Sequence, residues 1–367
     1  MAVMQANKSK VRPVFDFLEL NGFVTSNTAY ADVCIEKIRS WRRKGEHLFI
    51  IDLSRAYLQI HVHEKLWKYQ VVRLGGRQFC LTRLGFGLNV APKIMKAVVE
   101  KVILDHNVRA ACDSYLDDII VDESQMSAKS VKLYLSKYGL ESKVPRKIDG
   151  AQVLGLNVFK MNGKLNWKRD NKPLDSDVPT TKRQLFSFCG KVIGHFPVCG
   201  WLTSCSYLKR LCNDIGWDDP IPENVMKSIE NITVKFREHD PVQGKWRIEE
   251  TSNPVTIWCD ASSVAVGVVV ELNGNVIEDA SWLRKMDDDT HINLAELEAI
   301  IKGVNIAISN KFCKIKILTD SSSVRAWVAC TIMRDKPIST RGLRQSYFKD
   351  ELAFCIKYSK STKSMRQ

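Results

Sequence analysis

Two adjacent aspartates interrupt a stretch that otherwise has the composition of a buried β-strand: SYLDDIIVD, residues 114–122. Adjacent carboxylates repel each other, and a buried charge without a partner costs about 3–5 kcal/mol. The flanking stretches ACDSY and IIVDE predict two short strands, with Tyr115 to Asp118 at the tip of a hairpin. Successive strand side chains point to opposite faces, so Asp117 is expected to enter a cleft with Asp118 close to the same edge. The fold must therefore bring something to this tip that neutralises the pair.

A third aspartate is expected at the same place. HLFIIDL (47–53) predicts an apolar strand that ends in Asp52 and pairs alongside the hairpin. Divalent cations neutralise clustered carboxylates, and Mg²⁺ prefers oxygen ligands. Two ions bridged by aspartates support in-line phosphoryl transfer: one activates a 3′-hydroxyl and the other steadies a triphosphate. The tetrapeptide YLDD alone fits an ordinary hairpin turn with exposed aspartates equally well.

The charge of the chain points to an acidic partner. The net charge is +14, and between Lys65 and Val99 there are seven Lys or Arg residues and no Asp or Glu. Four aromatic residues lie among them, a mixture that tracks a phosphate backbone and stacks on bases. A second basic stretch, residues 160–210, has ten basic and three acidic residues. Either stretch alone also fits a generic solvated surface. The basic residues expected to bind nucleic acid are Arg73, Arg77, Arg83 and Lys93.

Nothing in the sequence predicts secretion or a membrane span. No run of 18 apolar residues occurs, and the start MAVMQANKSK lacks an apolar signal core. The eleven cysteines include no C-x-x-C pair, which favours reduced thiols in an intracellular protein. We therefore expect an intracellular protein, in a cytoplasmic particle or the nucleus, with no membrane partner.

The chain divides into three regions by pattern. Residues 1–160 alternate strands and helices, with a hairpin at Gly75-Gly76, a helix from Pro92 to about His106 and another over 125–138. Residues 161–245 are mainly helical, and EHDPVQGK (238–245) is the expected linker. Residues 246–367 return to strands, followed by a helix over 294–309, the strand CKIKILTD and a further helix.

Five ordered motifs in the first region resemble one family. The motifs are VRPVFDFLELN (11–21), FIIDLSRAYLQI (49–60), LGFGLNVAPKIM (84–95), YLDD (115–118) and VLGLNVF (153–159). Their order and spacing are similar to those of reverse transcriptases of LTR retrotransposons and retroviruses. The resemblance covers residues 4–160 and continues more weakly through the helical region. It implies an α+β right-hand polymerase with fingers, a palm sheet backed by two helices, and a thumb.

The resemblance also implies roles for individual residues. Asp52, Asp117 and Asp118 match carboxylates that hold two Mg²⁺ or Mn²⁺ ions, and Arg12 matches an arginine that contacts the incoming triphosphate. Tyr57 matches an aromatic gate that excludes a 2′-hydroxyl, so deoxynucleotides would be preferred. The nucleotide-binding residues also include Leu53, Ser54, Arg55, Ala56, Phe86 and Gly87, and the primer grip is Leu154 and Gly155.

The third region resembles ribonuclease H, another two-metal phosphodiester enzyme. Asp260 and Asp320 end predicted strands, and Glu296 lies on a predicted helix. Each motif alone is weak, because strand-ending aspartates commonly cap turns and helical glutamates are commonly solvated. Together, after a reverse transcriptase, they match catalytic, metal-binding carboxylates of a mixed α/β domain. Glu298 lies about 200° around the helix from Glu296, which makes Glu296 the better match.

Some features depart from the family. Leu18 stands where many relatives have a basic residue, and the fingers look N-terminally truncated, with either Lys8 or Lys10 as the expected fingers lysine. We also expect a C-terminally truncated, impaired ribonuclease H. A fourth carboxylate is lacking, because the acids after Asp320 lie outside the expected pattern. These acids are Asp335, Asp350 and Glu351.

The sequence thus predicts an RNA-directed DNA polymerase fused to a ribonuclease H-like domain, a piece of a retrotransposon Pol polyprotein. Its partners would be an RNA or DNA template with primer, and dNTPs. Two alternatives stay open: an inactive remnant that binds nucleic acid without polymerising, and another palm enzyme such as a nucleotidyl cyclase or an RNA-templated RNA polymerase. The oligomeric state does not follow from the sequence.

Overall fold

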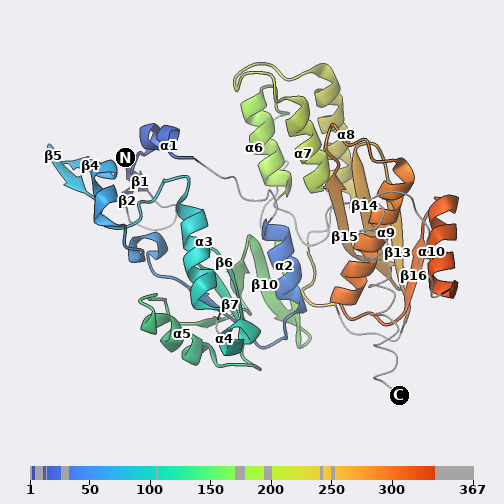
Figure 1. The fold of residues 1–367 in the computed structure, drawn as a ribbon, viewed down its shortest axis with the longest axis horizontal. Coiled ribbons are helices and arrows are strands. Elements are labelled where there is room, and N and C mark those ends of the chain that lie inside the picture. The colour runs from blue at the N-terminus through green and yellow to red at the C-terminus, as the bar shows by residue number, and fades with distance from the viewer. Residues whose placement is uncertain are drawn as a thin grey trace. The chain divides into compact units, whose positions relative to one another are not determined.

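The computed structural model describes residues 2–4, 11–13, 15–25, 33–104, 106–169, 178–193, 201–239, 243–248 and 253–334. The chain divides into two compact units (Figure 1). The first contains residues 1–154 and 158–165, and the second contains residues 155–157 and 166–367.

The first unit is built on a four-stranded antiparallel sheet in the order β6-β7-β3-β8. Its strands span Leu48–Asp52 (β3), Cys112–Tyr115 (β6), Asp118–Asp122 (β7) and Arg146–Lys147 (β8). On one face Ile51 and Ile119 pack against three helices, which are α3 (Ala91–Val102), α4 (His106–Ala111) and α5 (Ala128–Lys137). Because strand side chains alternate, the carboxylates next to these two isoleucines point to the other face.

Helix α2 (Val33–Arg43) is fixed to β6 through one carboxylate. Asp113 accepts hydrogen bonds from Lys37 Nζ at 2.5 Å and from Ser40 Oγ and Trp41 Nε1 at 3.1 Å each. The amide of Ser114 donates to the same carboxylate at 2.8 Å. With four donors, the half-buried charge of Asp113 is satisfied.

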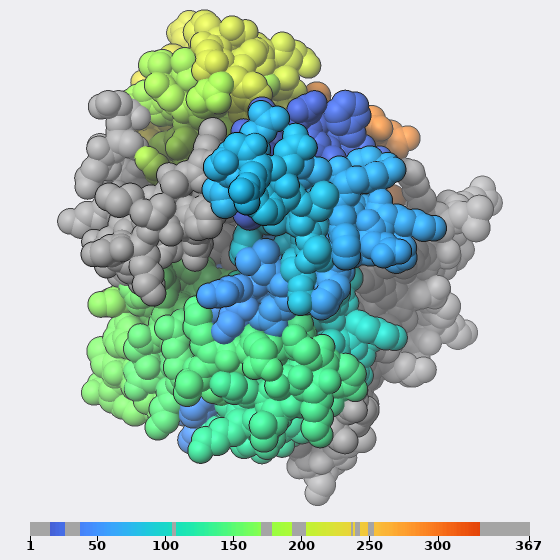
Figure 2. All heavy atoms as spheres, turned by 90° about the vertical axis from the view of Figure 1, so that its left-hand side faces the viewer, coloured from blue at the N-terminus to red at the C-terminus, as the bar shows by residue number. Residues whose placement is uncertain are grey.

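The rest of the first unit consists of short elements. They are β1 (Ala2–Met4), β2 (Val11–Pro13), α1 (Leu18–Phe23), η1 (Ala56–Gln59), η2 (Glu64–Tyr69), β4 (Val71–Leu74), β5 (Arg77–Cys80), β9 (Ala151–Val153) and β10 (Leu156–Met161). β4 and β5 form the predicted hairpin, with both turn glycines at positive φ. Nearly all of its side chains are exposed, and the blue segment that contains it is on the surface in Figure 2.

The second unit begins with a helical cluster. α6 (Lys182–Ile193), α7 (Trp201–Leu211) and α8 (Glu223–His239) share a core that includes Leu185, Leu208 and Val225. Strand β11 (Lys164–Arg169) pairs antiparallel with β12 (Gln243–Lys245). The stretch 238–245 that was expected as a linker therefore contains the end of α8 and a strand.

The same unit contains a mixed sheet in the order β15-β14-β13-β16. The strands span Val255–Ala261 (β13), Ala265–Leu272 (β14), Asn275–Leu283 (β15) and Ile315–Leu318 (β16). β13 runs parallel to β16, and the other pairings are antiparallel. Helices α9 (Ile292–Ser309) and α10 (Ser322–Arg334) pack with it, and the core joins Ile257 and Val268 of the sheet to Ile300 and Val304 of α9.

Two helix boundaries differ from the sequence predictions. The helix that was expected to run from Pro92 to about His106 ends at Val102, and the short helix α4 follows it. The helix that was expected over 125–138, directly after Ser124, begins at Ala128, because Ser127 caps it by accepting from the Ser130 amide. Ser124 instead donates its hydroxyl to Asp122 at 2.6 Å.

Candidate active sites

The hairpin of β6 and β7 brings the acidic pair to the end of β3. Tyr115 pairs with Asp118 across the hairpin, so Leu116 and Asp117 form its two-residue tip. Leu116 has a φ of 54°, in the left-handed region that non-glycine residues seldom adopt. On the other side of β7, Asp118 lies directly opposite Asp52. The structure therefore places the three predicted carboxylates at one edge of the sheet.

Backbone hydrogen bonds hold this edge together. The amide of Leu53 donates to the carbonyl of Asp117 at 3.1 Å, and that of Lys143 donates to the carbonyl of Asp52 at 2.9 Å. These bonds fix the hairpin tip on one side of Asp52 and the segment after α5 on the other.

The carboxylates of this edge are electrostatically coupled. Burial, together with the charges of Asp117 and Asp52, raises the pKa of Asp118 to about 6. The cations Arg146 and Lys143 oppose it. A carboxyl that ionises with difficulty beside two others is a group that a divalent cation would stabilise in its charged form.

Lys143 is a site residue that the sequence analysis missed. Its Nζ lies 2.6 Å from Oδ2 of Asp52. The signal was the basic stretch ESKVPRKI after α5, but nothing local shows which of its cations meets a residue 91 positions earlier. The ion pair balances part of the negative charge at this edge.

The segment after Asp52 is held in an unusual shape. Arg55 has φ 51° and ψ 43°, and the 3₁₀ turn η1 follows it. The side chain of Gln59 donates to the carbonyls of Ser54 and Glu141 and accepts from the Glu141 amide at 2.6 Å. These bonds fix the backbone from Leu53 to Ala56, which was predicted to cradle phosphate oxygens.

Tyr57, in the second motif, lies next to the predicted loop of the third motif. Its ring meets Phe86 edge-on, with centroids 5.0 Å apart. Burial raises the pKa of the Tyr57 hydroxyl, with smaller contributions from Asp117 and Tyr115. Gly87 has a φ of 97°, and a Cβ there would meet the carbonyl oxygen of Phe15 at 3.2 Å. The structure thus brings together Tyr57 and the loop of Phe86 and Gly87, three residues for which the resemblance implies nucleotide binding.

The other predicted residues lie in several places. Leu154 and Gly155 form the turn between β9 and β10, both at positive φ. Arg73 and Arg77 are exposed on the β4–β5 hairpin, and Lys93 is exposed on α3. Arg83 is partly committed, because its Nη1 donates to the carbonyl of Gln59 at 3.2 Å. Arg12 lies in β2, but its side chain is outside the described part of the structure, as are Lys8, Lys10, Asp335, Asp350 and Glu351.

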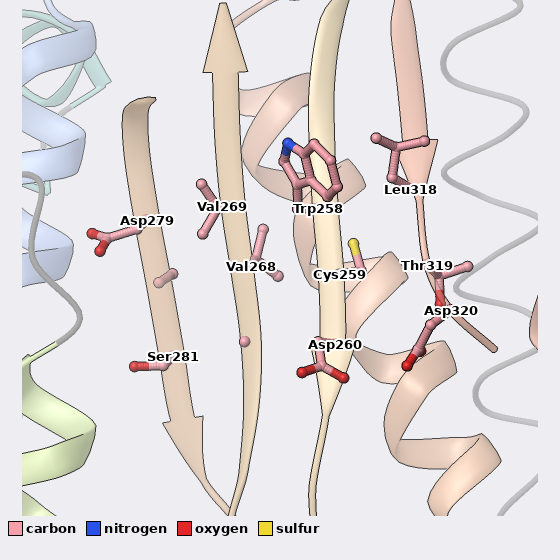
Figure 3. A pocket seen from close by; sticks show the side chains of 12 residues that line it. Trp258, Cys259, Asp260, Val268, Val269, Asp279, Ser281, Leu318, Thr319 and Asp320 are labelled. Carbon is pink, nitrogen blue, oxygen red and sulfur yellow. The ribbon is translucent and has the colours of Figure 1, made fainter. Parts of the chain in front are cut away.

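A second acidic group lies in the mixed sheet of the second unit. Asp260 lies one residue before the end of β13 and Asp320 follows β16, and because these strands are parallel both residues lie at one edge (Figure 3). Glu296 reaches this edge from α9. Ligand oxygens of the three residues lie within 4.8 Å of one another. Among the residues that the structure describes, no other group of three or more acids, histidines or cysteines meets that limit.

Glu296 is the buried member of this group. Its Oε1 accepts from the Ala261 amide at 3.1 Å, and its Oε2 is buried without a hydrogen-bond partner in the described structure. Burial raises the pKa of Glu296 and the charges of Asp260 and Asp320 raise it further, while hydrogen bonds from the Ala261 amide and the Thr319 side chain oppose the rise. An unpartnered buried oxygen beside two carboxylates fits a hard divalent cation. Glu298 points elsewhere and pairs with Lys302 at 3.3 Å.

A pocket of about 800 Å³ extends from this group along the sheet. Figure 3 shows Asp260 and Asp320 at one end of it and Trp258 and Leu318 farther along their strands. Trp258 is half exposed, and its Nε1 donates to Glu271 at 3.1 Å.

Comparisons with known proteins agree on one fold. A curated relative, the Retrovirus-related Pol polyprotein from transposon opus of Drosophila melanogaster, is 28% identical over 192 residues. The match covers 50% of this chain and 19% of that protein. A solved foamy viral protease-reverse transcriptase dRH in complex with ds DNA matches with a TM-score of 0.58 at 16% identity, over 96% of this chain and 62% of that one. This chain has the fold of a retroviral reverse transcriptase.

Other matches extend this result. The foamy viral protease-reverse transcriptase in complex with dsDNA gives a TM-score of 0.55 at 16% identity, over 96% of this chain and 74% of that one. The same protein in complex with an RNA/DNA hybrid gives 0.52 at 15%, over 96% and 48%. A family model described as "Domain of unknown function (DUF7047)" matches residues 181–238, which include α6, α7 and α8.

We call the sheet of β6, β7, β3 and β8 the palm sheet, because it carries the motifs that resemble the palm of a reverse transcriptase. The chain is similar to the reverse transcriptase and ribonuclease H region of a retrotransposon Pol polyprotein. It spans about a fifth of the length of its curated relative, 19%.

Proposed function

We propose that this chain is an RNA-directed DNA polymerase that adds dNTPs to a primer 3′-hydroxyl. The observation that carries the proposal is the pairing of Asp52 with Asp118 at the tip that holds Asp117. Three carboxylates at one sheet edge, in a fold shared with reverse transcriptases, suit a site for template-directed phosphoryl transfer.

Asp52, Asp117 and Asp118 would hold two Mg²⁺ or Mn²⁺ ions, which supply activation of the hydroxyl and charge neutralisation at the triphosphate. The residues of the chain contribute the rest. The fixed backbone of Leu53 to Ala56 would orient the nucleotide, and the Tyr57 ring would exclude a 2′-hydroxyl. Lys143 occupies Oδ2 of Asp52, so a metal ion would either bind the free Oδ1 or displace the Lys143 ammonium from Oδ2.

Template and primer would lie against basic, exposed side chains. Arg73, Arg77 and Lys93 are exposed, whereas Arg83 has a backbone partner. Side chains that contact phosphates supply most of the non-specific affinity and make it salt-dependent. These residues are therefore expected to bind nucleic acid whatever its sequence, because base pairing with the template selects each incoming nucleotide.

Primer extension on poly(rA)·oligo(dT) with Mg²⁺ or Mn²⁺ tests the proposal. The parent chain should extend the primer, and Asp117→Asn should reduce extension by orders of magnitude with little loss of template–primer affinity. A parent that binds template–primer but never extends it would favour the inactive-remnant alternative. An Asp117→Asn chain that extends at the parent rate would remove the hairpin from the site.

A second activity is favoured by a separate observation. The group of Asp260, Glu296 and Asp320 has the geometry and the unpartnered oxygen of a divalent-cation site. We propose that it cleaves the RNA strand of an RNA–DNA hybrid, with the impaired activity that the sequence predicts. Incubation of a 5′-labelled hybrid with Mn²⁺ should give short RNA products that disappear in Glu296→Gln.

We also propose an intracellular place for this chemistry, in a cytoplasmic particle or the nucleus. Within the described residues, none of the helices has the length and apolarity needed to cross a bilayer.

A further inference from the structure

Arg284 is a buried arginine immediately after β15 whose side chain is only 7% exposed. Its Nε donates to Oδ2 of Asp288 at 3.0 Å. Its Nη1 donates to the carbonyl of Ser262 at 3.0 Å, and its Nη2 to the carbonyl of Thr290 at 2.7 Å. One planar guanidinium therefore joins one carboxylate, that of Asp288, to two backbone carbonyls, those of Ser262 and Thr290.

Two of these points belong to the segments that carry the metal-site acids of the second unit. Ser262 lies two residues after Asp260, in the turn between β13 and β14. Thr290 lies in the loop two residues before the start of α9 and six residues before Glu296. The same guanidinium thus fixes the turn that follows one predicted ligand and the loop that leads to another.

Further bonds tighten this connection. The Arg284 amide donates to the carbonyl of Val264 at 2.9 Å, and Asp288 Oδ1 accepts from the Thr290 amide at 3.0 Å. From the other side of the turn, the Ala261 amide donates to Glu296 at 3.1 Å. The distance between the turn and the helix is therefore set by bonds on both sides of the acid group.

The backbone under Arg284 is anchored as well. Its carbonyl accepts from Arg210 Nη1 of helix α7 at 2.9 Å. Arg284 is thus held at its backbone carbonyl by α7 and at Nε of its side chain by Asp288. A side chain held in this way has little freedom to let the two acid-bearing segments move apart.

We propose that Arg284 is a positioning residue that sets the spacing of Asp260 and Glu296 for divalent-cation binding. The proposal rests on the nuclease site proposed above. A lysine keeps the charge but lacks the planar fork, so it cannot bond two carbonyls and a carboxylate in these directions. Changes to groups that orient metal ligands typically weaken metal affinity by about 10–100-fold. For burial alone an apolar residue would serve as well, because desolvating a charge offsets much of its pairing energy.

The experiment measures terbium binding in an Asp117→Asn/Asp118→Asn parent, which removes the competing palm carboxylates. Trp258 lines the same pocket as Asp260 and should sensitise terbium luminescence. In this parent, Glu296→Gln and Trp258→Phe should each abolish or reduce the signal, which assigns it to this site. Arg284→Lys should then raise the terbium dissociation constant about 10–100-fold.

Arg183→Lys is the matched control. Arg183 also makes a bidentate ion pair, with Asp218 at 2.8 and 3.0 Å, but on the exposed surface of the helical cluster. It should leave the terbium affinity unchanged. Asp288→Asn is a milder variant in case Arg284→Lys does not fold. It keeps the two carbonyl bonds and should weaken terbium binding in the same direction by less.

Thermal unfolding of each variant accompanies the titrations. A folded Arg284→Lys chain, or failing that a folded Asp288→Asn chain, with unchanged terbium affinity would overturn the proposal. A terbium signal that is unchanged in Glu296→Gln would also overturn it, because terbium would then not bind at the group of Asp260, Glu296 and Asp320. One outcome separates the two proposals. If a chain with intact palm aspartates binds terbium through Glu296 and loses that binding in Arg284→Lys, the role of Arg284 is supported. If that chain nevertheless cleaves no hybrid, the nuclease function is contradicted.

Discussion

Asp118 lowers the stability of the metal-free fold at a position where the proposed function needs a carboxylate. It is only partly exposed, it faces Asp52 across the sheet, and its pKa is raised to about 6. At pH 8 it is charged in both the folded and the unfolded chain, but the folded state disfavours that charge. The metal-free protein is therefore less stable at pH 8 than it would be with a neutral residue there.

Asp118→Asn should thus raise the free energy of unfolding of the metal-free protein at pH 8 by about 1 kcal/mol, a figure reduced for partial solvent screening. As the pH falls through about 6, the folded state of the parent binds a proton before the unfolded state does, so the parent gains stability and the difference shrinks. Urea denaturation at pH 8 and pH 5 measures both values. Exposed Asp214→Asn should change neither, and equal parent and Asp118→Asn stabilities at pH 8 would contradict the prediction.

Tyr57 supports a second prediction for a single residue. Its ring packs edge-on against Phe86 beside the acidic edge, so Tyr57→Ala would open space where a ribose 2′-hydroxyl is expected. Incorporation of rNTPs relative to dNTPs should rise by about tenfold or more, the effect of removing about 1.4 kcal/mol of discrimination. Tyr57→Phe keeps the ring and should keep the selectivity. Single-nucleotide kinetics with an unchanged ratio in Tyr57→Ala would show that Tyr57 is not the gate.

Individual elements show where sequence patterns suffice. The Gly75-Gly76 turn, the apolar strand ending in Asp52 and the YLDD hairpin follow from local pattern and turn chemistry, and the structure contains all three. Asp260, Glu296 and Asp320 lie within 4.8 Å of one another, whereas the palm aspartates share one end of their sheet without meeting that limit. Lys143 and Arg284 were missed, because their partners are set by sheet pairing and loop closure. The start of α5 was predicted after Ser124 instead of Ser127, because either serine suits an N-cap. In the structure the Ser124 hydroxyl donates to Asp122 and Ser127 caps the helix.

The attachment of α2 to the palm gives a prediction for an element. Asp113 accepts from three side chains of α2, and the ion pair with Lys37 is about one-fifth exposed on each side. Asp113→Asn should lower the free energy of unfolding by about 2 kcal/mol, because the donors of α2 lose a charged acceptor. Asp218→Asn removes an exposed ion pair and should cost less than about 1 kcal/mol. Equal losses in urea denaturation would mean that Asp113 does not fix α2.

The β4–β5 hairpin gives another prediction at this scale. Arg73 and Arg77 are exposed on it and have room to meet phosphates, whereas Arg83 donates to the backbone carbonyl of Gln59. Replacing Arg73 and Arg77 by Ala should weaken template–primer binding and reduce the slope of log K against log salt by about 1–2. Exposed Lys235→Ala, on α8, is the control for removing charge alone. A slope equal to that of the parent would mean that the hairpin does not contact the backbone.

The whole molecule combines two acidic centres that lie in separate compact units. Asp52, Asp117 and Asp118 belong to the first unit, whereas Asp260, Glu296 and Asp320 belong to the second. No residue is shared between the two groups, so the chemistry of one does not depend on the ligands of the other. The two proposed activities should therefore be separable by single substitutions.

Asp117→Asn should reduce primer extension by orders of magnitude and leave hybrid cleavage near the parent rate, because it removes a ligand of only the palm site. Glu296→Gln should abolish cleavage and leave extension near the parent rate. One preparation of each variant, assayed on a labelled RNA template annealed to a labelled DNA primer, reports both products together. Template–primer affinity, measured at fixed salt, should be similar in all three chains, which shows that neither loss comes from weaker binding. If Glu296→Gln also stops extension while it binds template–primer normally, the two centres are coupled and the division of labour between the units is wrong.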